Sequence, residues 1–127
     1  MEDIQDLASI RIMVDDFYTR VRKDELLGPV FSSVITGDWQ PHLNQMYDFW
    51  NAALFGVPGF RGSPFIKHAP LPIGTEHFIR WIKLFNQTID GHFQGQVAAT
   101  AKNKAELMSV LFQNKLQYAK GQKKIIF

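Results

Sequence analysis

The chain contains no cysteine among its 127 residues. This absence excludes disulfides, iron–sulfur clusters and every metal site that depends on a thiolate ligand. The sequence also lacks an apolar run close to the roughly 20 residues that cross a bilayer. Its first six residues are acidic and contain no apolar core of the kind found in a signal peptide. We therefore expect a soluble, cytoplasmic protein with no membrane partner.

The sequence also has no large excess of positive or negative charge. Fourteen Lys and Arg stand against 12 Asp and Glu, which gives a formal net charge of +2. The basic residues are dispersed, apart from two short clusters at 20–23 and 120–124. Nucleic-acid-binding domains usually concentrate positive charge on one face or along one helix. We therefore predict no nucleic-acid partner.

Aromatic residues, in contrast, are abundant. They make up 13% of the chain and include eleven Phe and three Trp, which is more than a small helical domain needs for packing alone. A chain of this length fits one domain, but it is short for a protein that must also enclose a large flat cofactor, which would then supply part of the core. A core filled by phenylalanine alone explains most of these residues too, so composition leaves both alternatives open.

Apolar residues recur at spacings of three and four in four stretches, which predicts four sizeable helices. The expected ranges are 4–23, 38–55, 74–93 and 97–118. Asp38 and Thr75 are the expected N-caps of the second and third helices. Residues 27–29 (Leu-Gly-Pro) are predicted to form a turn, and residues 30–37 a short corner between helices. No stretch of useful length alternates as a strand would.

These patterns predict an all-α fold. A chain this short, with one interrupted stretch between the second and third helices, favours two antiparallel helix pairs that cross each other over an up-and-down bundle. Residues 1–120 are predicted to form a single domain. Residues 121–127 have no clear register and are expected to be a C-terminal tail, open to disorder.

Four histidines are available for chemistry: His42, His68, His77 and His92. No two of them stand four residues apart, and no clustered set of carboxylates and histidines resembles a zinc or di-iron site. A conventional metal cage is therefore not expected. His77 falls beside the apolar face of its helix and His92 lies at a helix end, so we expect both at the surface.

His68 stands on a short segment bounded by prolines, just before the aromatic helix that carries Trp81. An imidazole held on such a turn, facing aromatic side chains, is a candidate axial ligand of haem iron. With no cysteine, a thiolate-ligated haem and covalent attachment through a C-x-x-C-H motif are excluded, so such a haem would be noncovalent. A buried structural histidine explains this residue about equally well.

His42 shares an apolar helix face with Met46, one turn away. Taken alone, His42 is better explained as a partly buried structural residue. Two histidines on separate segments, together with Tyr18 and Trp81 on the apolar faces of two other helices, form an arrangement that isolated core residues would not require. The combination favours a functional site between the helices.

The stretches that carry these residues, in this order, resemble the truncated haemoglobins of group III, which are short globins with a two-over-two helical sandwich. They are Phe17-Tyr18 with residues 21–24 and 27–31, His42 with Phe49-Trp50, Lys67-His68 with Leu71-Pro72, and residues 78–85. The resemblance spans about residues 5 to 120. The absence of the Gly-Gly pairs found at helix ends in the other two groups also points to the third.

The resemblance implies a role for eight residues. His68 would be the proximal ligand of the iron in a noncovalent haem b (iron protoporphyrin IX). Tyr18, His42 and Trp81 would line the distal side, with Met46 beside them. The remaining haem contacts would be Phe31 and Phe49 against the ring, with Trp50 near the propionates. On charge grounds alone, Arg61 and Lys67 are candidate partners for the propionate carboxylates.

The function that this site implies is binding of O₂ or another diatomic ligand, as in oxygen transport. The Tyr18 hydroxyl and the Trp81 indole N–H are donors that would stabilise negative charge on the ligand. His42 could donate, gate the pocket or coordinate iron, and we favour the gate. One alternative is a haem enzyme, a peroxidase or an NO dioxygenase, supplied by an external reductase. Another, from a different class, is a cofactor-free helical interaction module.

Overall fold

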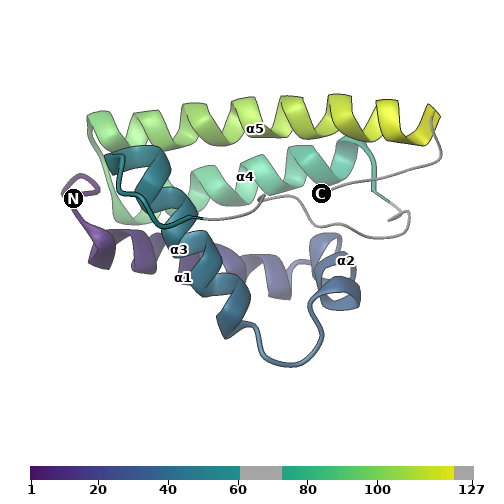
Figure 1. Cartoon of the computed structure of the whole chain (residues 1–127), viewed down its shortest axis with the longest axis horizontal. Helices are drawn as coiled ribbons and strands as arrows, with labels where there is room; N and C mark the ends of the chain where they lie inside the picture. Colours follow the sequence, from purple (N-terminus) through teal and green to yellow (C-terminus); the bar gives the residue numbers. More distant parts are fainter. Residues whose placement is uncertain (61–72, 122–127) are drawn as a thin grey trace.

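The computed structural model describes residues 1–60 and 73–121, with side chains described as far as residue 114. The described residues form five helices and no strand: α1 (Leu7–Lys23), α2 (Leu27–Val34), α3 (Gln40–Phe55), α4 (Thr75–His92) and α5 (Gln96–Gly121) (Figure 1). The predicted all-α class is confirmed. The predicted tail falls, apart from Gly121, on residues 122–127, which lie outside the described residues.

The helices are arranged as two pairs. α4 and α5 run antiparallel side by side, and α3 crosses α1 obliquely (Figure 1). Contacts between α1 and α4 join the pairs, and α3 also contacts α5. The expected crossing of two helix pairs is therefore present, and it brings α1, α3 and α4 to a common centre.

Helix α1 follows the predicted periodicity, with Ile10, Met13, Val14, Phe17, Tyr18 and Val21 buried on one face. It begins later than predicted, because the Asp6 carboxylate accepts a hydrogen bond from the Ser9 N–H at 2.9 Å and caps the helix there. The segment before α1 is held by a different carboxylate. The Asp3 carboxylate accepts hydrogen bonds from the N–H groups of Val97 and Ala98, at 2.9 and 2.8 Å, and so joins the N-terminus to the start of α5.

Helix α2 replaces the turn that was predicted at residues 27–29. The Asp24 carboxylate accepts hydrogen bonds from the N–H groups of Leu26 and Leu27, at 3.0 and 2.9 Å. Pro29 fits the first helical turn because its missing N–H has no partner to lose there. Gly28 packs so closely on α1 that an added Cβ would lie 2.8 Å from the Arg22 carbonyl oxygen. The corner is therefore a short helix, separated from α1 by three residues.

Aromatic rings from three helices meet at the centre of the core. The Phe17 ring packs edge-on against Trp81 and Phe85, with centroid distances of 5.6 and 5.3 Å. Trp50 stacks on Phe85, with ring centroids 5.2 Å apart. The abundant aromatic residues of the sequence thus join α1, α3 and α4 around a shared cluster.

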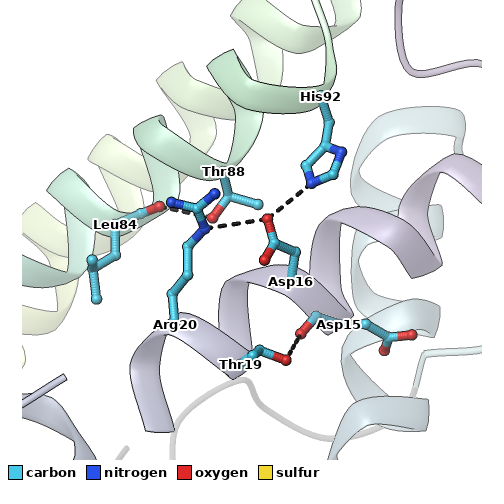
Figure 2. Close-up of polar contacts among 7 residues, drawn as sticks. All are labelled: Asp15, Asp16, Thr19, Arg20, Leu84, Thr88 and His92. Carbon is cyan, nitrogen blue, oxygen red and sulfur yellow. Dashed lines mark hydrogen bonds and ion pairs between the residues drawn. The ribbon is translucent and has the colours of Figure 1, made fainter. Parts of the chain in front are cut away.

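Of the two histidines expected at the surface, His92 is exposed and His77 is not. His77 has a side chain that is only 12% exposed, and its Nδ1 accepts a hydrogen bond from the Gly74 N–H at 3.0 Å. That prediction was wrong because the N-cap of α4 is Gly74 and not Thr75. His77 is then the third residue of the helix, and its ring accepts the hydrogen bond of the cap residue. His92 is exposed at the end of α4, as predicted, and its Nε2 lies 2.8 Å from Asp16 Oδ2 (Figure 2).

The Asp16 carboxylate also contacts a second basic side chain. Arg20 Nε lies 3.2 Å from the same carboxylate oxygen, so Asp16 on α1 holds one group from its own helix and one from α4 (Figure 2). All three side chains are 29–38% exposed, so solvent weakens these ion pairs and their contribution to stability is small. Of the two contacts, the one with His92 joins α1 to the end of α4, whereas the one with Arg20 lies within α1.

Candidate functional site

Tyr18 lies on the inner face of α1 and is 7% exposed. Burial raises the pKa of its phenol well above the usual value because the charged phenolate would lose its hydration. Its hydroxyl therefore keeps its proton at neutral pH and remains a hydrogen-bond donor.

His42, on the first turn of α3, meets Tyr18 directly. The two rings are edge to face, with centroids 5.0 Å apart and an interplanar angle of 87°. Burial lowers the pKa of the imidazole, so it is neutral at pH 7. Its Nε2 is buried and has no hydrogen-bond partner among the residues that the structure describes.

An unpartnered buried nitrogen is unusual in a folded protein, since leaving such a group unpaired costs about 1–3 kcal/mol. A ligand that hydrogen-bonds to His42 would supply the missing partner. The chemistry of this wall, a protonated phenol beside a neutral imidazole, fits the distal side of a haem pocket. These residues are therefore compatible with the cofactor that the sequence implied.

The other predicted distal residues lie nearby. Phe17 connects Tyr18 to Trp81, because its ring centroid is 4.9 Å from the first and 5.6 Å from the second. Trp81 is half-buried on α4. Met46, one turn beyond His42 on α3, is 5% exposed and belongs to the core. The structure thus gathers the four distal candidates around the crossing of α1, α3 and α4.

The predicted apolar cofactor contacts fall into two groups. Phe31, on α2, lies 6.2 Å from the Tyr18 ring and is part of the same wall. Phe49 and Trp50 lie further along α3 and contact each other edge-on at 5.3 Å. Trp50 is only 4% exposed, and the Phe85 stack holds it within the core.

Three predicted residues, Arg61, Lys67 and His68, fall within residues 61–72, outside the described part of the chain. The proximal ligand and the two cationic partners for propionates therefore stay predictions. Among residues 1–60 and 73–121, no group of three or more metal-binding side chains comes together. No helix in that same part is long and apolar enough to cross a membrane.

Trp39 belongs to this wall, although it was not among the predicted site residues. This residue precedes α3, is 7% exposed, and lies 6.2 Å from both the Tyr18 and the His42 rings. The Arg22 guanidinium covers it, 4.6 Å from the ring centroid. The signal was present in the spacing, because a residue three positions before His42 lies on the same face of a helix.

Asp24 and Arg80 anchor α4 next to Trp81. Arg80 Nη1 lies 2.6 Å from Asp24 Oδ1, and the Asp24 side chain is 9% exposed. Burial alone would raise the pKa of this carboxyl, but the hydrogen bonds from the Leu27 N–H and from Arg80 outweigh it and hold the pKa below the usual value. The same carboxylate thus caps α2 and fixes the α4 residue that precedes Trp81.

Comparisons with known proteins agree with this architecture. The model of the bacterial-like globin family matches residues 2–116. The chain is 33% identical over 112 residues to the Group 3 truncated hemoglobin ctb of Campylobacter jejuni, an alignment that covers 85% of this chain and 88% of that protein. It also matches the crystal structure of a group III truncated hemoglobin from Campylobacter jejuni, with a TM-score of 0.79 and 30% identity, over 91% of this chain and 95% of the other. The chain therefore belongs to the bacterial-like globins, and within them to the group III truncated haemoglobins.

Proposed function

We propose that this globin binds O₂ or another diatomic ligand at the iron of a noncovalent haem b, with His68 as the proximal ligand and Tyr18, His42 and Trp81 on the distal side. Family membership supports a haem protein for diatomic ligands. The observation that carries the distal assignment is the buried, unpartnered Nε2 of His42 beside the buried Tyr18.

Haem iron would supply the binding position for the ligand, and the protein supplies the polar groups around it. The Tyr18 hydroxyl holds its proton because burial raises its pKa, so it donates a hydrogen bond to negative charge on a ligand. The Trp81 indole N–H is the second donor. Two donors would slow the escape of a polar ligand.

His42 is the gate in this proposal. Its neutral imidazole costs less to move through an apolar wall than an imidazolium would, since a buried charge carries a large desolvation penalty. Tyr18 and Trp81 already provide the donors. His42 is therefore free to move aside as a ligand enters.

Apolar contacts for the cofactor would come from Phe31 and Phe49, with Met46 beside the distal residues. Met46 belongs to the hydrophobic core, and the two Phe side chains pack against it. Trp50 would contact the edge of the ring, and Arg61 and Lys67 would pair with the propionates. The family relationship favours this assignment over the cofactor-free interaction module that composition left open. A cytoplasmic location and a role in oxygen transport are further parts of the proposal.

The experiment that tests the haem assignment is the visible spectrum of the purified protein. The wild-type chain should show an intense Soret band, and the His68→Ala variant should weaken or lose it. His92→Ala is the matched control, because His92 is an exposed histidine whose partner is Asp16. An unchanged band and unchanged iron ligation in His68→Ala would refute the proximal role.

A second candidate function is that of a haem enzyme, a peroxidase or an NO dioxygenase. The neutral His42 imidazole, with its free Nε2, favours it, because such a nitrogen can accept a proton from a peroxide. Electrons would come from an external reductase. Steady-state turnover with hydrogen peroxide or NO, in the presence of a reductant, decides between the two functions. Negligible turnover would leave ligand binding as the function.

A further inference from the structure

Arg22 contacts Trp39 at the outer edge of the distal wall. Its guanidinium lies 4.6 Å from the centroid of the Trp39 ring. Arg22 itself is exposed, whereas Trp39 is 7% exposed. The indole is therefore enclosed between a cation near the solvent and the rings of the distal side.

On its inner side, Trp39 faces Tyr18 and His42, the two distal residues whose rings contact each other. Its ring centroid lies 6.2 Å from that of Tyr18 and 6.2 Å from that of His42. Tyr18 and Arg22 are four residues apart on α1, and Trp39 and His42 are three residues apart at the start of α3. Residues at these spacings share a helix face, so the two pairs form one block between the helices.

The middle of α3 is held separately. The Tyr47 hydroxyl donates a hydrogen bond to Asp15 on α1. Arg11 lies over the same ring, with its guanidinium 5.7 Å from the Tyr47 centroid. Neither Tyr18 nor His42 takes part in these two contacts. Loss of the Trp39 contact would therefore loosen the first turn of α3 while the rest of the helix stays attached to α1.

The polar contacts described for the first turn of α3 stay within the helix and its cap. Its N-cap is Trp39, whose side chain makes no capping hydrogen bond. The Asp38 carboxylate accepts one hydrogen bond from the Gln40 N–H, at 2.9 Å, and both residues are exposed. The turn is held against the core by packing: His42 contacts Tyr18, Leu43 packs on the core, and the Trp39 ring contacts both Tyr18 and His42. Of these contacts, the Trp39 ring is the one that Arg22 covers.

We propose that Arg22 is a positioning residue of the distal side: by covering Trp39 it keeps that ring against Tyr18 and His42, and it thereby sets how readily His42 moves aside for an entering ligand. This inference rests on the proposed function, since it takes His42 as the gate. Arg22 touches no ligand in this scheme, and its effect passes through the indole.

The first test is the rate of CO association after flash photolysis of the haem-loaded protein. Arg22→Met keeps much of the side-chain volume but removes the cation, and it should speed association about two- to fivefold, the range that follows from losing one cation–π contact of ordinary strength. Arg22→Lys retains a cation over the ring and should restore most of the wild-type rate. Arg11→Met is the matched control, because it removes the equivalent contact at Tyr47, and its rate should stay at the wild-type value.

The second test asks whether Arg22 acts through Trp39. In a Trp39→Leu background the ring is absent, so Arg22→Met should leave the CO association rate of that background unchanged. An equal acceleration in both backgrounds would overturn the proposal, since it would show an effect that bypasses the indole. Equal acceleration by Arg11→Met would overturn it too, because general loosening of α3 would then explain the result.

A measurement independent of ligand binding separates this inference from the proposed function. Nuclear Overhauser contacts between the Trp39 indole and the His42 ring should weaken in Arg22→Met and persist in Arg11→Met. They can be followed in the CO-bound protein, or in the full chain as purified if it takes up no haem. Failure to bind haem would refute the proposed function, whereas unchanged contacts in Arg22→Met would refute the positioning role of Arg22.

Discussion

The rings of Tyr18 and His42 meet edge to face, with their centroids 5.0 Å apart. Burial raises the pKa of the first and lowers that of the second, so both side chains are neutral at pH 7. The wall they form therefore carries hydrogen-bonding atoms but no net charge. Such a wall can stabilise partial charge on a small neutral ligand without the cost of burying an ion.

Replacing Tyr18 by Phe should speed O₂ dissociation. The phenyl ring preserves the contacts with Phe17 and Phe31, so only the donor is lost. A hydrogen bond of about 0.5–1.5 kcal/mol corresponds to a roughly two- to tenfold faster rate. Stopped-flow displacement of O₂ measures it directly. An equal or slower rate would rule out Tyr18 as a donor to the ligand.

His42 should make the stability of the fold depend on pH in a defined window. Its pKa in the folded protein lies below the usual 6.5, so between these two values the unfolded chain binds more protons. Its contribution to the free energy of unfolding is fully present above pH 6.5 and is lost as the pH falls through 6.5 toward the folded-state pKa. Urea unfolding should therefore show falling stability below pH 6.5.

The comparison variant is His42→Phe, which keeps an aromatic ring against Tyr18 but cannot titrate. The difference between its pH profile and that of the wild type isolates the imidazole from the carboxylates, which titrate at lower pH. Parallel profiles from pH 7.5 to 5 would contradict the depressed pKa of His42.

Helical periodicity predicted most of the fold, because helix burial follows a regular spacing. The second and third predicted helices, 38–55 and 74–93, differ from α3 and α4 by one or two residues at their ends. The short helix α2 was missed, since Leu27-Gly28-Pro29 is typical of a turn. Two contacts override that local signal, namely the cap from Asp24 and the close approach of Gly28 to α1.

For the same physical reasons, some residues of the site could be predicted from the sequence and others could not. Tyr18 and His42 were found because each lies on the apolar face of its own helix. The contact between Arg22 and Trp39 could not be found that way, because it depends on how the α2 corner returns the chain to α1. Phe17 similarly links Trp81 to Tyr18, a relationship set by the crossing of α1 and α4.

Replacing Gly28 by Ala should destabilise the fold by about 1–3 kcal/mol, the usual cost of forcing an atom into a packed site. The new Cβ would lie 2.8 Å from the Arg22 carbonyl oxygen, which is backbone and cannot easily move. Gly91→Ala is the control. Its Cβ would meet only the end of the Arg20 side chain, at 3.9 Å, so the higher helix propensity of Ala should leave it neutral or up to about 1 kcal/mol more stable. Urea unfolding compares the two, and equal effects would show that the α1–α2 corner is not tightly packed.

Replacing Asp24 by Ala should cost more stability than replacing Arg80 by Met, although both remove the same ion pair. Arg80 is 39% exposed, so solvent screens the pair and its loss alone should cost at most about 1 kcal/mol. Asp24→Ala also removes the hydrogen bonds to the Leu26 and Leu27 N–H groups, and loss of a helix N-cap typically costs about 1 kcal/mol more. Urea unfolding of the two single variants and the double variant gives both contributions. If Asp24→Ala proved no worse than Arg80→Met, the cap would contribute nothing and α2 would be held by packing alone.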